Sequence, residues 1–116
     1  MLDNKILRNI QDIIDELYPA VIMLNQYKHE EDVPLGFLMC VTTRAKIYEN
    51  TKTLIKMYKK GQDYDYLLQR IFHQLKLHRN QINRLSKTNS TDHQSVHRFC
   101  VALVALLYIA FSDKTT

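Results

Sequence analysis

Apolar residues along this chain recur every three or four positions, which is the spacing of one face of an α-helix. The first such pattern covers residues 3–27 and carries acidic side chains on its opposite side. Pro19 falls inside the pattern, where it removes an amide donor and clashes with the preceding turn. We therefore expect this helix to be kinked or broken near Leu17 and Tyr18.

A second helical pattern follows a charged connection and covers residues 35–60. Gly61 should end this helix, because glycine adopts the left-handed conformation that a helix C terminus often needs. The apolar stripe of the helix consists of Phe37, Cys40, Val41, Ile47, Tyr48, Leu54, Ile55 and Tyr58.

Two further helices complete the pattern, at residues 63–86 and 91–111, separated by a polar turn. Asp63 and Thr91 are the expected N-caps, because a short oxygen-bearing side chain can accept a bond from a free helical amide. The third helix has an apolar seam that steps by alternate threes and fours, as in a heptad repeat. The seam positions are Leu68, Ile71, Leu75, His78, Ile82 and Leu85.

The number and length of these segments predict the fold. Two glycines and two prolines in 116 residues are too few for the many turns of a β-sandwich or barrel. Four helices with short connections are typical of an up-down-up-down antiparallel four-helix bundle. We therefore expect an all-α protein in which residues 1–116 form a single domain.

The last predicted helix is apolar on every side in its second half. Residues 99–111 form an uninterrupted apolar run, which is shorter than the roughly 20 residues that cross a bilayer. The run is therefore expected to be a buried helix without membrane contact. Three neighbouring helices cover only about half of such a helix, so the surplus predicts a homo-oligomer. The candidate interface residues are Phe99, Leu103, Leu106, Leu107 and Tyr108.

The two cysteines, Cys40 and Cys100, lie within apolar periodic runs. Such cysteines usually pack as small hydrophobic side chains. We expect a cytoplasmic protein with both thiols reduced, and a disulfide between them is the less favoured alternative.

The charges are distributed unevenly along the chain. Residues 1–32 carry three basic and seven acidic side chains, whereas residues 33–116 carry thirteen basic and five acidic ones. A surface of cations is sufficient to contact a phosphate backbone without reading its sequence. The candidate nucleic-acid-binding residues are Lys46, Lys52, Lys56, Lys59, Lys60, Arg70, Lys76, Arg79, Arg84 and Lys87.

Two readings of this basic surface stay open. It is either an RNA- or DNA-binding face or a solvated face that keeps the protein soluble. Tyr64 and Tyr66 begin the third helix close to the lysines, and exposed tyrosines beside cations can stack on unpaired bases.

The sequence contains no recognisable catalytic constellation. It lacks a Gly-rich phosphate loop, a nucleophile elbow, a Cys-x-x-Cys pair and a His-Glu-x-x-His motif. It also lacks the Arg and His spacing of helical ribonucleases. We therefore expect a protein that is not an enzyme and has no cofactor.

Four histidine and cysteine positions need separate consideration. His93, His97 and Cys100 share one helical face and could bind zinc, although partly exposed histidines beside a core cysteine are the favoured interpretation, so no metal is expected. His78, at a seam position, is either a hydrogen-bonded core histidine or a polar group that sets register or oligomer state.

Several short stretches resemble one family of small four-helix bundles. The Leu-Tyr-Pro sequence at 17–19 resembles a stretch in the first helix of that family. Val-Pro-Leu-Gly at 33–36 leads into a second helix whose middle, AKIYEN at 45–50, is also similar. A Leu- and Arg-rich third helix at 66–85, a polar break at 87–90 and a closing helix at 92–111 complete the order.

The family includes the accessory variability proteins of diversity-generating retroelements and the proteins encoded in bacterial 23S rRNA intervening sequences. The resemblance implies a non-enzymatic homopentamer that binds RNA or DNA and associates with a reverse transcriptase during mutagenic copying of a template. The acidic first helix departs from the more basic accessory proteins. The alternative is a small helical protein-binding module, such as a bacteriocin immunity protein or a phage-encoded inhibitor.

Overall fold

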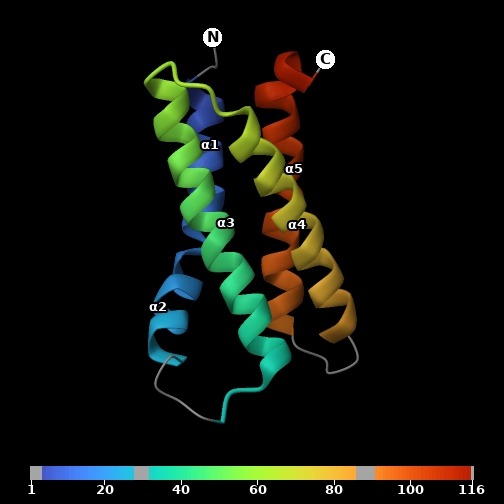
Figure 1. Ribbon diagram of the computed structural model, residues 1–116. Coiled ribbons are helices and arrows are strands. Elements are labelled where there is room, and N and C mark those ends of the chain that lie inside the picture. The colour runs from blue at the N-terminus through green and yellow to red at the C-terminus, as the bar shows by residue number, and fades with distance from the viewer. Residues whose placement is uncertain (1–3, 28–31, 86–90, 116) are drawn as a thin grey trace.

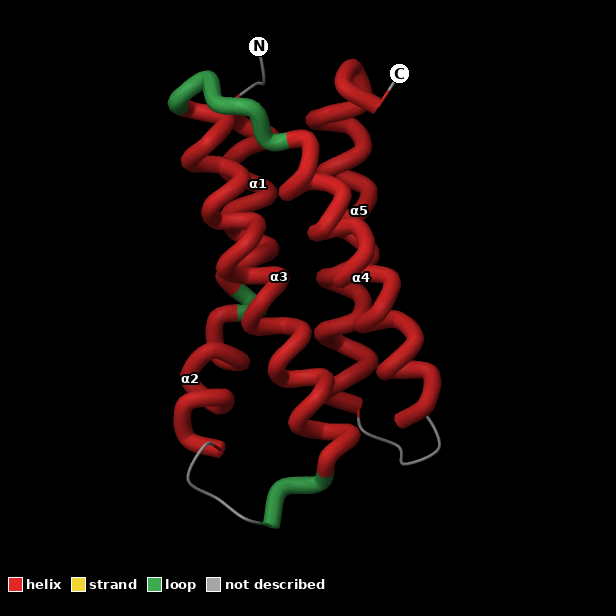
Figure 2. The backbone as a smooth tube through the Cα atoms, in the orientation of Figure 1, coloured by secondary structure: helices red, strands yellow, loops and turns green. Residues whose placement is uncertain are grey.

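All secondary structure in the described part of the chain is helical. The structure is a computed structural model that describes residues 4–27, 32–85 and 91–115, except the side chains of residues 85, 91–95, 99 and 112–115. The helices are α1 (Asn4–Asp15), α2 (Tyr18–Tyr27), α3 (Leu35–Lys59), α4 (Asp65–Leu85) and α5 (Thr91–Thr115) (Figure 2). The expected all-α class is confirmed for these residues. None of the described helices is both long enough and apolar enough to cross a membrane.

The break expected near Pro19 separates α1 from α2. The amides of Glu16 and Leu17 bond to carbonyls only three residues earlier, at 3.1 and 2.8 Å, so the last turn of α1 is tightened. Proline has no amide hydrogen to continue the ladder. The chain therefore changes direction here and begins a new helix.

Two aromatic pairs hold α2 against α3. The rings of Tyr18 and Tyr48 have centroids 5.3 Å apart, and those of Tyr27 and Phe37 are 5.7 Å apart. These contacts lie near the two ends of α2. They explain why the segment after the break packs on α3 although it buries few residues of its own.

Gly61 ends α3 as predicted. Its φ of 70° is the left-handed conformation that lets its amide bond to the Tyr58 carbonyl at 3.1 Å. The amide of Gln62 bonds to the carbonyl of Met57 at 3.0 Å. This pair of bonds is the Schellman motif, which satisfies carbonyls that the helix end would leave free.

Helix α4 begins two residues later than predicted, at Asp65 instead of Asp63. The backbone N–H of Asp65 nevertheless donates to Oδ1 of Asp63 at 3.1 Å. Asp63 therefore satisfies a free amide at the start of the helix, although the helical conformation begins after it.

The helices pack in a closed order. α3 packs against α1, α2 and α4, and α5 packs against α1 and α4. Figure 1 shows that α1 and α4 run away from the end where both termini lie, whereas α3 and α5 run back toward it. Helices α1 and α4 thus lie at opposite corners, each between α3 and α5.

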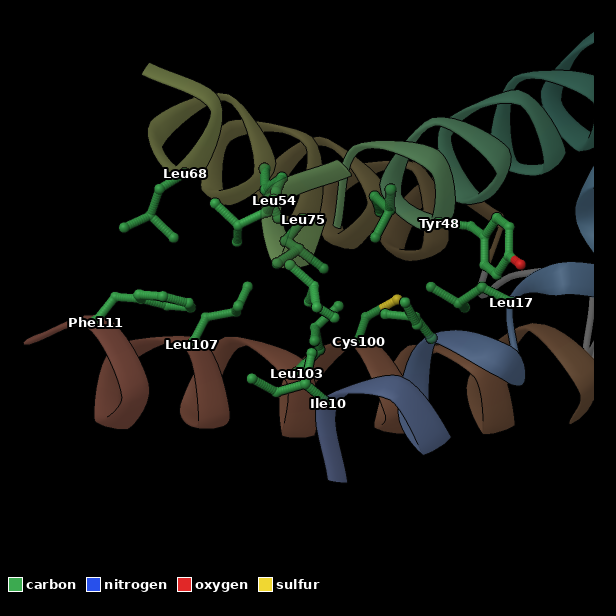
Figure 3. Packing of buried hydrophobic residues seen from close by; sticks show 14 of the residues in the cluster. Ile10, Leu17, Tyr48, Leu54, Leu68, Leu75, Cys100, Leu103, Leu107 and Phe111 are labelled. Carbon is green, nitrogen blue, oxygen red and sulfur yellow. The ribbon is translucent and has the colours of Figure 1, made fainter. Parts of the chain in front are cut away.

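One apolar cluster fills the space between α1, α3, α4 and α5 (Figure 3). At the end where α3 stops, Tyr58, Tyr64 and Phe111 close this core, with ring centroids 5.0 to 6.0 Å apart. The predicted end of the last helix at Phe111 needs correction. The backbone of Phe111 is non-helical, with φ −121° and ψ 19°, but helix resumes and reaches Thr115.

Two of the candidate interface residues, Leu103 and Leu107, are fully buried in this core. They cannot face a second subunit while the core is intact, so this part of the interface prediction is corrected. Leu106 is partly buried, Tyr108 is exposed, and the side chain of Phe99 lies outside the described residues.

Gly61 provides a test of how α3 ends. Replacing it with alanine forces a Cβ into the left-handed region, which should lower the free energy of unfolding by about 1–2 kcal/mol. The site has open space around it, so any loss reports backbone strain and not a clash. Urea denaturation measures the change. Gly36→Ala, at an exposed helical position, is the control and should instead raise stability by up to about 1 kcal/mol. Equal effects of both variants would contradict this account.

Candidate nucleic-acid interface

Helix α4 has two opposite faces. Its seam is buried as predicted at Leu68, Ile71, Leu75, His78 and Ile82, whereas the side chain of Leu85 lies outside the described residues. The opposite face is a stripe of exposed residues spaced by threes and fours, which we call the outer face of α4. It consists of Tyr66, Arg70, His73, Leu77, Asn80 and Arg84.

A buried polar contact fixes α4 against α3. The Nε of Arg44 donates a hydrogen bond to Nε2 of His78 at 3.1 Å, and both side chains are buried. An imidazole nitrogen that accepts a bond carries no proton, so the His78 ring is neutral. His78 is therefore a hydrogen-bonded core histidine, the first of its two predicted roles, and its bond across the helix pair also bears on the second, the setting of register.

A second polar bond crosses the same helix pair. Nδ2 of Asn50 on α3 donates to Oε1 of Gln74 on α4 at 3.0 Å. Hydrogen bonds between defined atoms are satisfied in one register, whereas apolar contacts tolerate small shifts. These two bonds therefore define the position of α4 along α3.

The outer face of α4 borders two grooves. The first lies between α3 and α4, has a volume of about 490 Å³ and is lined by Lys46, Tyr66, Arg70 and His73 among others. The exposed fraction of Tyr66 is 79%, so its ring is available at the end of this groove. Tyr64, the other candidate for base stacking, is buried in the aromatic cluster instead.

The second groove lies between α4 and α5 and has a volume of about 640 Å³. Lys76 and Arg79 contribute cations to it, and Phe72 and Tyr108 contribute aromatic rings. His73 lines both grooves, as does Gln69. The two grooves therefore adjoin each other across α4.

The structure divides the predicted basic surface into two groups. Lys46, Arg70, Lys76 and Arg79 line the grooves beside α4, and Arg84 continues the outer face toward its end. All ten candidates except Lys87, which lies outside the described residues, have exposed side chains.

The remaining lysines belong to α3 and its end. The Nζ of Lys52 is 3.5 Å from the hydroxyl of Tyr48, and Lys59 lines a separate hollow of about 240 Å³ with Arg8 and Gln11 of α1. Lys59 thus lies on the α1 side of α3, and Lys52 lies beside Tyr48, whose ring packs on Tyr18 of α2; neither lysine lines an α4 groove. Lys56 and Lys60 are exposed near the same end of α3 and line neither α4 groove.

Acidic side chains lie on the opposite corner of the molecule. Asp12, Asp15 and Glu16 are exposed on α1 or directly after it. Between Tyr66 and Leu85, α4 carries no aspartate or glutamate. The charge imbalance along the sequence is therefore also an imbalance in space, with α4 on its positive side.

The residues of the less favoured zinc alternative, His93, His97 and Cys100, do not form a metal-binding cluster among the described side chains. The side chain of His93 lies outside the described residues, and among the described residues no three metal-binding side chains come together. Burial raises the pKa of the Cys100 thiol to about 12, so this sulfur is protonated at neutral pH, whereas zinc binds the thiolate. Burial also raises the pKa of Cys40, and both cysteines are free thiols.

The groove residues that the sequence candidates for nucleic-acid binding missed include Phe72, His73 and Tyr108. His73 lies four residues after Gln69 and three before Lys76, so its place beside the cations is visible in the helical spacing. The rings of Phe72 and Tyr108 pair at a centroid distance of 4.5 Å and join two helices. Because the two residues are far apart in the chain, no local sequence pattern predicts this pairing.

Comparison with known proteins finds no matching family model, no matching curated protein and no matching solved structure. The function must therefore be argued from the site itself.

Proposed function

We propose that this chain is a non-enzymatic accessory protein that binds RNA or DNA through α4. The observation that carries the proposal is the outer face of α4, where cations lie beside two adjoining grooves and no carboxylate intervenes after Asp65. The cations of α4 have no carboxylate on their own helix after Asp65, which leaves them available to neutralise phosphates.

The length of this face suits a nucleic-acid backbone. Arg70 and Arg84 are fourteen residues apart, which corresponds to about 21 Å along a helix. Successive phosphates of a duplex strand are about 3.4 Å apart along the axis, so several phosphates lie within this span. Contacts of this kind add affinity that depends on salt but carry no sequence specificity.

The arrangement of the helices supports a finer proposal about the fold. α1 and α2 together act as the first helix of an up-down-up-down antiparallel four-helix bundle, followed by α3, α4 and α5. This is the architecture that the resemblance to retroelement accessory proteins implies. In that setting the protein partner is a reverse transcriptase, and the bound nucleic acid is the RNA template or its DNA copy.

We further propose that the chain assembles as a homo-oligomer, with a pentamer favoured by the same resemblance. The supporting feature is an apolar strip on α5 that lies outside the α4–α5 groove. Ala102, Leu106 and Ile109 share one helical face, and the exposed fraction of Ile109 is 65%. We expect this strip, in place of the buried Leu103 and Leu107, to form the contact between subunits.

Reversing the charges beside α4 tests the binding proposal. In a variant with Lys46, Arg70, Lys76 and Arg79 replaced by glutamate, affinity for a labelled single-stranded RNA should fall at least about tenfold. The slope of log affinity against log salt should become shallower by about 3, because each lost phosphate contact removes about 0.7. Fluorescence anisotropy over a salt series measures both quantities.

A matched control carries the same change in net charge elsewhere. Glutamate replaces Lys52, Lys56, Lys59 and Lys60 in this second variant, which leaves both α4 grooves intact. Its salt slope should stay close to that of the parent. Equal losses in the two variants would mean that net charge, and not the α4 face, determines binding.

Native mass tests the proposed assembly. Light scattering at moderate salt should give a mass about five times 13.8 kDa, and Ile109→Glu should lower it by placing a charge in the apolar strip. A monomeric parent protein would contradict the oligomer. It would also favour the alternative class, in which the exposed apolar residues of α5 bind a different protein.

A further inference from the structure

We infer that the α4–α5 groove is a pocket for an unpaired base of a single-stranded nucleic acid. The phosphates beside that base would lie on Lys76 and Arg79. This inference rests on the proposed function, because it assigns the kind of strand that the α4 face binds.

The size and lining of the groove fit such an occupant. Its volume of about 640 Å³ lies within the roughly 300–1,000 Å³ typical of small-ligand pockets. Leu75, Val101 and Val104 make its walls apolar, which suits the flat faces of a base. Lys76 and Arg79 are exposed and add the positive charge that a nucleotide phosphate requires.

An aromatic platform is already assembled in this groove. The rings of Phe72 and Tyr108 lie nearly parallel, with an interplanar angle of 25° and centroids 4.5 Å apart. One face of Tyr108 is therefore covered, yet its exposed fraction is 52%. Much of Tyr108 is therefore accessible to solvent beside the groove, and exposed aromatic rings are the surfaces on which bases stack.

His97 adds a polar group to the wall of the same groove. Burial, with a smaller contribution from the positive charge of Arg79, lowers the pKa of His97 and favours the neutral ring. Its Nδ1 is buried from solvent and has no hydrogen-bond partner in the described part of the chain. A neutral imidazole in the wall of the groove adds polarity without adding charge.

The adjoining grooves favour a strand over a free nucleotide. Because Gln69 and His73 line both grooves, a strand that places one base against Tyr108 can cross α4 toward Arg70 and Tyr66. Alternating cations and exposed aromatic rings are the usual surface of single-strand-binding proteins. A duplex keeps its bases paired and stacked, so it cannot supply a base to this groove.

Tyr108→Ala tests the stacking contact. The probe is a labelled oligouridylate of about 12 nucleotides, a length within the range that small single-strand-binding domains cover. Loss of one stacking contact should weaken its binding about fivefold or more, whereas binding of an RNA duplex of similar length should not change. Tyr108→Phe should bind as the parent does. Ala105→Trp, which places a large side chain into the groove from an exposed position, should weaken single-strand binding in the same way.

Tyr18→Ala is the matched control. Tyr18 has an exposed fraction of 46% and also packs on another aromatic ring, but it lies on α2, outside the groove. This variant should bind both probes as the parent does, and circular dichroism checks that every variant is folded.

The outcomes separate the two proposals. If Tyr108→Ala binds the oligouridylate as tightly as the parent while the charge-reversed α4 variant has lost binding, the groove inference is overturned and the binding proposal stands. If uridine monophosphate competes as effectively as the oligouridylate, the groove takes free nucleotides and the strand assignment is overturned. If the parent binds neither these RNA probes nor single-stranded and duplex DNA of the same length, both proposals fail.

Discussion

The burial of one face of α4 determines which of its side chains are exposed to solvent, and the proposed binding surface depends on this. Full burial of an aliphatic side chain contributes about 1.5–3 kcal/mol, and Leu68, Ile71 and Leu75 each make such a contribution. Rotating the helix by half a turn would expose them and place Arg70 and Arg84 in the core, where an unpaired charge is strongly unfavourable. The apolar seam therefore forces the cations outward. The bond from Arg44 to His78 then sets the position of this cationic face along α3.

The same packing places the acidic and the basic segments of the chain on opposite sides of the molecule. Helix α1, with Asp12 and Asp15, contacts α3 and α5 from the corner opposite α4. An anionic strand is attracted toward the α4 side and repelled from the α1 side, which favours productive encounters at low salt. The grooves on either side of α4 then supply contacts that charge alone lacks, because each groove combines cations with an exposed tyrosine.

Local signals in the sequence were sufficient for the helices but not for the surfaces between them. The break before Pro19, the end of α3 at Gly61 and the buried seam of α4 each depend on neighbouring residues, and they were predicted correctly. In the sequence, the lysines of α3 look like part of one basic surface with α4. Which side of the molecule they face depends on how the two helices pack, and spacing along the chain does not reveal this. Helix α5 is apolar on all sides, so spacing could not separate the buried Leu103 from the exposed Tyr108. The groove between α4 and α5 forms only where these two helices pack side by side.

A map of the RNA contacts on the protein would test the central claim most directly. In an amide nuclear magnetic resonance titration with single-stranded RNA, we expect shifts for the outer face of α4 and for the residues of its two grooves. The amides near Lys52 and Lys59, and those of α1, should change little. Shifts that cluster on the α1 side of α3, or no shifts at saturating RNA, would contradict the account of α4 as the nucleic-acid-binding face.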